Sequence, residues 1–131
     1  MERQNYSTGT PWEAIAGYSR AVRVGAMVFV SGTTATDTEG TIHHPNDAYG
    51  QAVYIYQKIA ASLQAVQSSL RDVVRTRVYI TRSEDVQAVI KAHHEFFESI
   101  RPANTLVVVA ALAAPEMLVE IEVDAVIADS L

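Results

Sequence analysis

The segment from Asp47 to Leu70 constrains the fold most strongly, because it is apolar around nearly its whole circumference. Its apolar residues recur at steps of three and four, which predicts an α-helix, and Asn46 or Asp47 can cap its start. Lys58 is the only charged residue between Asp47 and Arg71. A helix with so little charge is usually covered on more than one side. The chain must therefore supply another layer against which this helix packs.

Strand-like segments supply that layer. Two β-branched runs between Tyr18 and Gly32 meet at Gly25 and Ala26, which predicts a hairpin, and the polar stretch from Gly32 to Asn46 predicts a loop. The segment 73–81 alternates between apolar and polar residues, with Val74 on the apolar face, and the segment 119–125 alternates in the same way. The run 104–112 is apolar on both faces, which is typical of a strand buried on both sides.

A second helix is predicted between the strand 73–81 and the run 104–112. Ser83, Glu84 and Asp85 provide a cap and an acidic first turn, and an apolar stripe then continues to Arg101. The predicted order is ββαβαββ in a single domain of residues 1–131. An α+β architecture with both helices on one face of the sheet accommodates this order.

The other face of the sheet is predicted to be partly ionic. Glu120, Glu122 and Asp124 lie opposite the apolar face of the last strand, and Arg75 and Arg77 lie opposite that of the strand 73–81. If these strands are neighbours, their charged side chains form ion pairs across the sheet. Water is one environment for such a face. Contact with another subunit is the alternative, favoured by the run 104–112, which is apolar on the same side.

Composition excludes several classes of protein. Ten basic and fifteen acidic residues give a net charge of -5, which is unfavourable for binding a phosphate backbone. The chain has no cysteine, so disulfides and thiolate chemistry are excluded. No uncharged apolar run reaches the roughly 20 residues of a membrane span, and the first residues have no apolar core typical of a signal peptide. We therefore expect a cytoplasmic protein that binds neither nucleic acid nor a membrane.

The motifs that would indicate a metal, a phosphate or a serine nucleophile do not occur. His43–His44 and His93–His94 are adjacent pairs, whereas two ligands on one helix face are three or four residues apart. We predict no metal site, with His93 packed in the core or at an interface and His94 exposed. His43 and His44 lie in a polar loop. No phosphate-binding glycine motif and no GxSxG motif occur.

Five segments together resemble the Rid (RidA/YjgF) family, and the resemblance runs from about Tyr18 to Ala128. They are 18–22 (YSRAV), 28–32 (VFVSG), 73–79 (VVRTRVY), 101–105 (RPANT) and 119–122 (VEIE). The resemblance implies a chorismate-mutase-like fold, a homotrimer and small-molecule clefts between subunits. It also implies hydrolysis of enamines or imines, such as 2-aminoacrylate, to a keto acid and ammonia, a reaction that needs no metal or cofactor.

The resemblance assigns roles to individual residues. Glu120 matches the family glutamate that holds a water near the substrate, and Tyr18 matches a tyrosine of the cleft. Ser31 matches the serine of the Ser-Gly block, and Thr33 stands where a glutamine is often found. Asn104 replaces the arginine that grips the substrate carboxylate in the deaminases, and Thr105 follows it. An amide offers only neutral hydrogen bonds, so this half of the site departs from the family.

These residues predict a hydrolase with Glu120 as the catalytic group. Tyr18, Ser31, Thr33, Asn104 and Thr105 are its substrate-binding candidates. Glu120 can act as a base if burial or its acidic neighbours raise its pKa, whereas an ion pair with Arg75 or Arg77 would make it structural. Because Asn104 lacks the charge of arginine, we expect little activity on 2-aminoacrylate. A metabolite-binding trimer without catalysis is the alternative, and an endoribonuclease or translation inhibitor is a third.

Overall fold

Six strands form one mixed sheet in the order β1-β2-β3-β6-β4-β5. The computed structural model describes residues 1–128. The strands are β1 (Arg3–Tyr6), β2 (Ala21–Val24), β3 (Met27–Thr33), β4 (Val73–Ile80), β5 (Ala103–Val108) and β6 (Val119–Val126). Only β4 and β5 pair in parallel, because α3 (Val86–Phe97) connects them. The predicted α+β class is confirmed.

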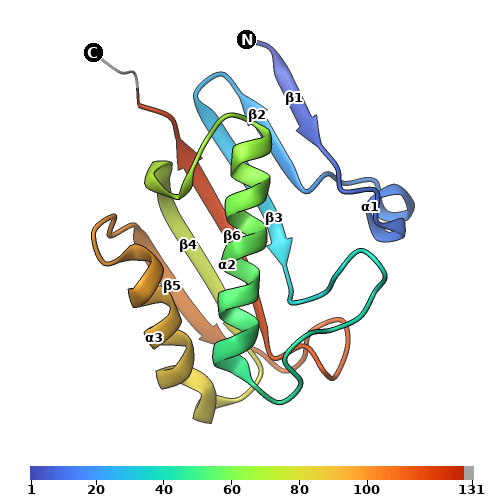
Figure 1. Ribbon diagram of the computed structural model, residues 1–131, viewed down its shortest axis with the longest axis vertical. Helices are drawn as coiled ribbons and strands as arrows, with labels where there is room; N and C mark the ends of the chain where they lie inside the picture. The colour runs from blue at the N-terminus through green and yellow to red at the C-terminus, as the bar shows by residue number, and fades with distance from the viewer. Residues whose placement is uncertain (129–131) are drawn as a thin grey trace.

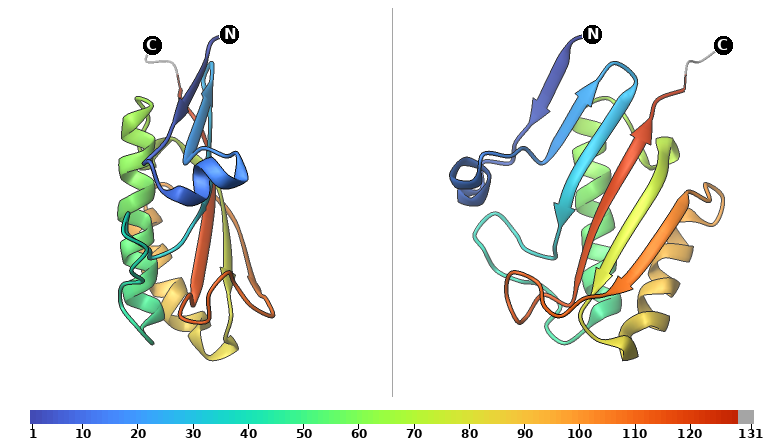
Figure 2. Two further views of the ribbon diagram at one scale, coloured as in Figure 1. Left: turned by 90° about the vertical axis from the view of Figure 1, so that its right-hand side faces the viewer. Right: turned by 180° about the vertical axis from the view of Figure 1, so that it is seen from behind.

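The two long helices cover the same face of the sheet, as predicted (Figures 1 and 2). The first is α2 (Ala48–Ala65), and the carboxylate of Asp47 caps it by accepting a hydrogen bond from the Gly50 amide at 2.9 Å. This helix stops short of the predicted end at Leu70, since Gln67 has a φ of 63° and a 3₁₀ turn (Leu70–Asp72) follows. The fully buried Ile55, Ile59 and Leu63 face the core between helix and sheet.

The N-terminal strand β1 and the short helix α1 (Pro11–Ala16) were not predicted by the ββαβαββ order. The polar sequence of β1 carries no apolar period, and the strand forms because its backbone pairs with β2 in antiparallel register. Helix α1 begins at a proline and ends at Gly17, which has a φ of 78°. Both elements depend on signals other than hydrophobic alternation.

Two further expectations are wrong in detail. Strand β5 lies at the edge of the sheet, ends at Val108 and leaves Val107 39% and Val108 49% exposed, so within one chain it is not buried on both sides. Val74 is 48% exposed instead of facing the core with Thr76. The pairing of β4 with β6 shifts register between Val73 and Arg75, and this irregularity turns Val74 outward.

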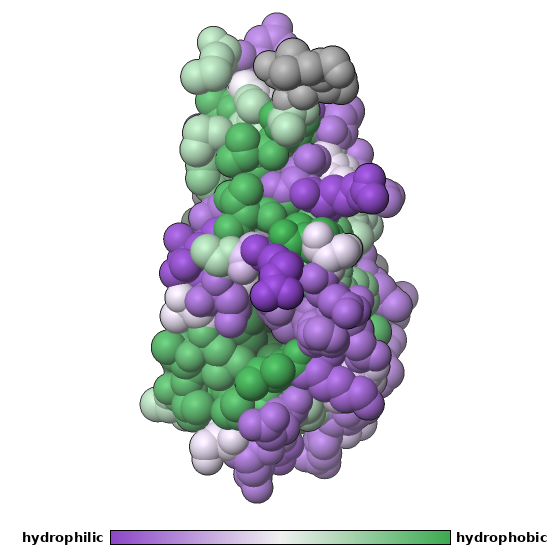
Figure 3. Space-filling model, turned by 90° about the vertical axis from the view of Figure 1, so that its left-hand side faces the viewer, coloured by the Kyte–Doolittle hydropathy of each residue, from purple (hydrophilic) through white to green (hydrophobic). Residues whose placement is uncertain are grey.

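The face of the sheet away from the helices, here called the open face, mixes charge with apolar surface. One ion pair of the predicted kind forms, between Arg77 Nη1 and Asp124 Oδ2 at 3.1 Å. Exposed apolar residues of the open face are Met27, Phe29, Val74, Val107 and Val126. Viewed from the β5 side, apolar zones are separated by polar side chains (Figure 3). None of the helices formed by residues 1–128 has the length and apolar character that a membrane span requires.

Candidate functional site

Glu120 lies in β6 at a hollow of about 360 Å³ on the open face. Gly32, in the neighbouring strand β3, lies against its carboxylate so closely that a Cβ atom at position 32 would overlap Oε2. Tyr79, Glu122 and the loop residue Leu112 line other parts of the hollow. Among the described residues, the Glu120 carboxylate has no hydrogen bond or ion pair, so the predicted structural pairing with Arg75 or Arg77 is not formed.

The surroundings of Glu120 raise the pKa of its carboxyl group. Burial raises the pKa of Glu120, and the negative charge of Glu122 raises it further, although Arg20 opposes this shift. Glu122 is itself engaged, because the Tyr79 hydroxyl donates a hydrogen bond of 2.5 Å to its Oε1. The result is a carboxylate with free lone pairs and a pKa above its usual range, which suits a general base.

Arg20 links the predicted cleft residues on the β2–β3 side. Its Nη2 donates to the Gly32 carbonyl at 2.7 Å, and its guanidinium carbon lies 5.4 Å from the centre of the Tyr18 ring. Ser31 is tied to the same segment, since its hydroxyl donates to the Ser19 carbonyl at 2.6 Å. Arg20 belongs to the segment 18–22, but no sequence pattern indicated its role. Tyr18 and Ser31 thus lie with Glu120 at one end of the sheet.

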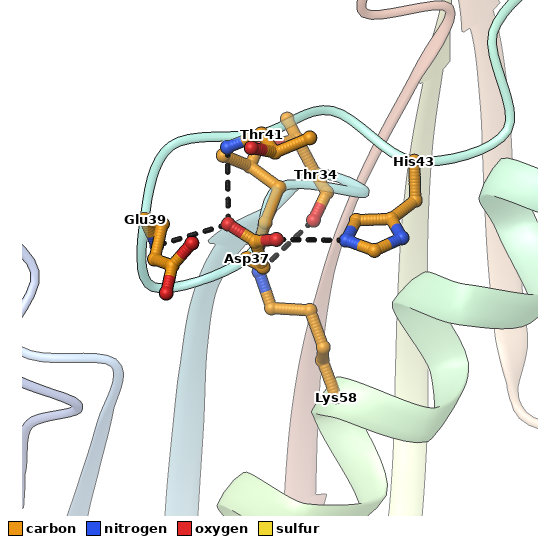
Figure 4. A network of polar contacts seen from close by, with 7 residues as sticks. Thr34, Asp37, Glu39, Thr41, His43 and Lys58 are labelled. Carbon is orange, nitrogen blue, oxygen red and sulfur yellow. Dashed lines mark hydrogen bonds and ion pairs between the residues drawn. The ribbon is translucent and has the colours of Figure 1, made fainter.

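Thr33 is buried and does not line an open cleft. It is 3% exposed, and its hydroxyl donates to the Ser31 carbonyl at 2.8 Å. The loop that follows is held from α2 by Lys58, whose Nζ donates to the carbonyls of Thr34 at 3.0 Å and Thr36 at 2.6 Å (Figure 4). Burial and the nearby charge of Arg20 lower the pKa of Lys58 to about 8. These contacts fix the path of the chain directly after Gly32.

The loop histidines lie in that network. His43 Nε2 contacts Asp37 Oδ2 at 2.8 Å, and the His43 ring stacks on Tyr54 with centroids 4.6 Å apart (Figure 4). In α3, His93 is partly buried against Phe97 and His94 is exposed, as predicted. Residues 1–128 contain no group of three or more acidic or histidine side chains that could hold a metal ion.

Asn104 and Thr105 are adjacent in β5 and therefore face opposite sides of the sheet. Thr105 is on the open face, where its hydroxyl accepts a hydrogen bond of 2.6 Å from Arg75 Nη2. Asn104 is on the helix face, where it lines a hollow of about 310 Å³ between α3 and β5. Strand β4 separates β5 from β6, and within one chain Asn104 and Glu120 do not share a site.

Glu13 is a buried carboxylate that was not among the residues predicted to be functional. It accepts hydrogen bonds of 2.6 Å from the hydroxyls of Ser7, Thr8 and Thr10, and one of 3.2 Å from the Thr8 amide. Its carbonyl accepts from the Tyr18 amide at 2.9 Å, so it also anchors the entrance to β2. The spacing of Thr10 and Glu13 around a proline is a helix-start signal that would have located it.

Comparison with known proteins identifies relatives along almost the whole chain. Residues 8–127 match the family model described as Endoribonuclease L-PSP. An uncharacterised protein of Streptomyces coelicolor is 37% identical over 118 residues, covering 90% of this chain and 87% of that protein. The 3-aminoacrylate deaminase RutC of Acinetobacter baylyi is 31% identical over 113 residues, covering 86% of this chain and 88% of that enzyme.

A crystal structure has the same fold. Rv2704 of Mycobacterium tuberculosis, a member of the YjgF/YER057c/UK114 family, superimposes with a TM-score of 0.88. The two are 39% identical in sequence, and the alignment covers 96% of this chain and all of that chain. The fold and the sequence therefore indicate the same relatives.

Proposed function

The chain belongs to the Endoribonuclease L-PSP family, which includes the Rid and YjgF proteins, and from this premise we propose that it hydrolyses a small enamine, imine or related carbonyl metabolite. The reaction takes place in a cleft between copies of the chain. Glu120 activates water, Tyr18 and Ser31 border the cleft, and the Asn104 side chain with the Thr105 backbone of a neighbouring copy contacts the polar end of the substrate.

Glu120 is the observation that carries this proposal. It is the carboxylate at the open-face hollow that lacks a hydrogen-bond partner among residues 1–128, and burial raises its pKa. In imine hydrolysis it accepts a proton from water as the water oxygen bonds to the C=N carbon. The nitrogen takes up that proton and then the hydroxyl proton, the C–N bond breaks, and a carbonyl compound and ammonia leave.

A second copy is needed to complete the site. Asn104 lies on the helix face of the edge strand β5, and Glu120 lies on the open face of β6. The free edge of β5 and the exposed apolar residues of the open face are suitable surfaces for a neighbouring subunit. These features support the homotrimer that the family resemblance implies, with one ligand cleft at each contact between subunits.

The substrate's polar end is expected to differ from that of 2-aminoacrylate. Asn104 offers neutral hydrogen bonds where the family deaminases have a guanidinium, and a carboxylate held by such a residue loses a strong bidentate partner. The relative from A. baylyi is named for a deamination of an enamine acid, which supports the reaction class. We expect this chain to perform the same type of C–N cleavage on a different compound.

The test generates 2-aminoacrylate with a serine dehydratase and follows release of the keto acid. We expect slow acceleration by the wild type and an increase of at least about tenfold with Asn104→Arg, because the new guanidinium pairs with the carboxylate. In the Asn104→Arg background, Glu120→Gln lowers the rate by about 10²-fold. The exposed Glu39 provides the matched control, and Glu39→Gln leaves the rate unchanged.

Other results contradict the proposal. Wild-type acceleration equal to that of an authentic RidA would show that Asn104 does not weaken carboxylate binding. No acceleration by either the wild type or Asn104→Arg would favour the metabolite-binding trimer without catalysis. Cleavage of RNA by the wild type that is lost in Glu120→Gln would favour the endoribonuclease named in the family model.

A further inference from the structure

Three side chains from three different elements form a hydrogen-bonded chain beneath Asn104. His93 of α3 contacts the hydroxyl of Thr76 in β4, with Nε2 and Oγ1 at 2.8 Å. The same hydroxyl donates to Oδ1 of Asn104 in β5 at 2.9 Å. Thr76 has no exposed surface, so water does not compete for its hydroxyl. The contact partners of Thr76 are therefore fixed by the protein.

The number of available protons determines which group donates in each of these two hydrogen bonds. A hydroxyl has one proton, and Thr76 gives it to Asn104, so Thr76 must accept a proton from His93. Burial lowers the pKa of His93, which keeps the ring neutral near pH 7 with a single ring proton. That proton is consequently on Nε2, and Nδ1 carries a lone pair.

The orientation of the Asn104 amide follows. Its Oδ1 is occupied by Thr76, so its Nδ2 hydrogens are the donors that remain for a ligand, and no partner for them occurs within residues 1–128. Asn104 lines the hollow of about 310 Å³ between α3 and β5, whose apolar lining includes Val78, Val89 and Leu106. A small apolar body with a polar end fits such a surface.

We propose that Thr76 and His93 are positioning residues that hold Asn104 as a hydrogen-bond donor, and that the site thereby selects a ligand whose polar end is an uncharged carbonyl over one that ends in a carboxylate. This inference rests on the proposed function, in which Asn104 contacts the substrate. An uncharged acceptor such as a 2-keto-amide satisfies the Nδ2 hydrogens at little desolvation cost.

A ligand that ends in a carboxylate binds less favourably at Asn104. At Asn104 it would exchange its hydration for neutral donors, because the neutral His93 ring carries no charge. The exposed charged side chains at the hollow are Arg101 and Glu98, which have opposite signs, and His94 lies 3.7 Å from the Glu98 carboxylate. The formal charges of Arg101 and Glu98 therefore cancel at the rim.

The experiment titrates pyruvamide and pyruvate separately into the ¹⁵N-labelled protein and follows the Asn104 side-chain amide by NMR. We expect pyruvamide to bind at least about fivefold more tightly than pyruvate, as one well-placed neutral hydrogen bond allows. Thr76→Val abolishes this preference, because the hydroxyl that links His93 to Asn104 is removed. Thr76→Ser restores it, and Thr38→Val at an exposed threonine leaves it unchanged.

A second set of variants covers the case in which Thr76→Val does not fold. In His93→Gln the side-chain amide can still donate to Thr76 and the preference for pyruvamide is retained, whereas His93→Leu loses it. The ring nitrogen signals of wild-type His93 should show the proton on Nε2. A purely structural role for the three residues would change stability without changing the ratio of the two affinities.

The inference is overturned if pyruvate binds as tightly as pyruvamide, if neither probe binds, if Thr76→Val keeps the wild-type ratio, or if the His93 proton is on Nδ1. If the proposed function is wrong but this inference is right, the experiments give a different result. In that case the preference for pyruvamide and its dependence on Thr76 persist, while no imine or enamine is hydrolysed.

Discussion

Glu13 is buried and Glu120 is half-buried, and their surroundings have opposite effects on the charge of the carboxylate. Burial alone would raise the pKa of Glu13, yet hydrogen bonds from Ser7, Thr10 and Thr8 outweigh burial and lower it to about 2. Burial also raises the pKa of Glu120, and there no hydrogen bond from the described residues counteracts it. A glutamate side chain is thus stabilised as an anion at position 13 and destabilised as an anion at position 120.

The difference separates a structural carboxylate from a reactive one. Glu13 has all of its acceptor capacity used by its own N-terminal segment, and its role is to fix α1 and the approach to Tyr18. Glu120 keeps its lone pairs available at a hollow. Stability and function therefore make opposite demands on a buried acid, and identical substitutions at the two positions should have opposite effects.

The largest expected effect is that of Glu13→Gln, which should lower the free energy of unfolding by about 2–3 kcal/mol. The three hydroxyls that surround Glu13 all donate to it, and the NH₂ group of glutamine would place a donor among donors. Urea unfolding at pH 7 measures the loss, and hydrogen exchange at the Thr8 amide, a donor to Glu13, should accelerate.

The contribution of Glu13 should also depend on pH. Its pKa is lowered on folding from 4.5 to about 2, so its stabilisation is present above pH 4.5 and is lost as the pH falls toward 2. The stability difference between wild type and Glu13→Gln should shrink across that window. Glu39→Gln, at an exposed site, should stay within about 0.5 kcal/mol of wild type. A difference that is constant with pH would contradict this account.

Glu120→Gln should have the opposite sign and raise the free energy of unfolding at pH 7 by roughly 0.5–1 kcal/mol. Folding raises the pKa of Glu120, so its stabilising contribution is present below its unfolded pKa of 4.5 and is lost as the pH rises through its folded pKa. The gain from the substitution should consequently disappear in acid. A loss of stability at pH 7 would show that Glu120 has a favourable partner in solution.

Gly32→Ala is expected to have the smallest effect on stability of these three substitutions, within about 0.5 kcal/mol, while displacing the Glu120 carboxylate. The added Cβ would overlap Oε2, which is the far end of a flexible side chain and can move away. Carboxyl NMR should show the pKa of Glu120 shifted, and any hydrolytic activity should fall. In a Glu120→Ala background the same glycine substitution should have no further effect on activity, and an additive loss would rule out this contact as the cause.

Sequence periodicity predicted most of the elements that build the core. The helix after Asp47, the stripe of α3 and the alternation of β6 are local patterns set by which side chains must avoid water, and they are confirmed. Alternation also placed Arg77 and Asp124 on one face of the sheet, and the adjacency of β4 and β6 then brings them into an ion pair. The resemblance to the Rid family indicated Glu120 and Asn104 as site residues.

What the sequence by itself determined was the order of these elements and the faces on which their side chains lie. Only the tertiary structure decided that β5 is an edge strand, that β6 lies between β3 and β4, and that Asn104 and Glu120 are on opposite faces. The hydroxyls around Glu13 and the chain from His93 through Thr76 to Asn104 likewise depend on the fold. The physical reason is that hydrophobic periodicity is a property of one segment, whereas strand order, burial of a charge and the direction of a hydrogen bond depend on several segments that meet only in the folded chain.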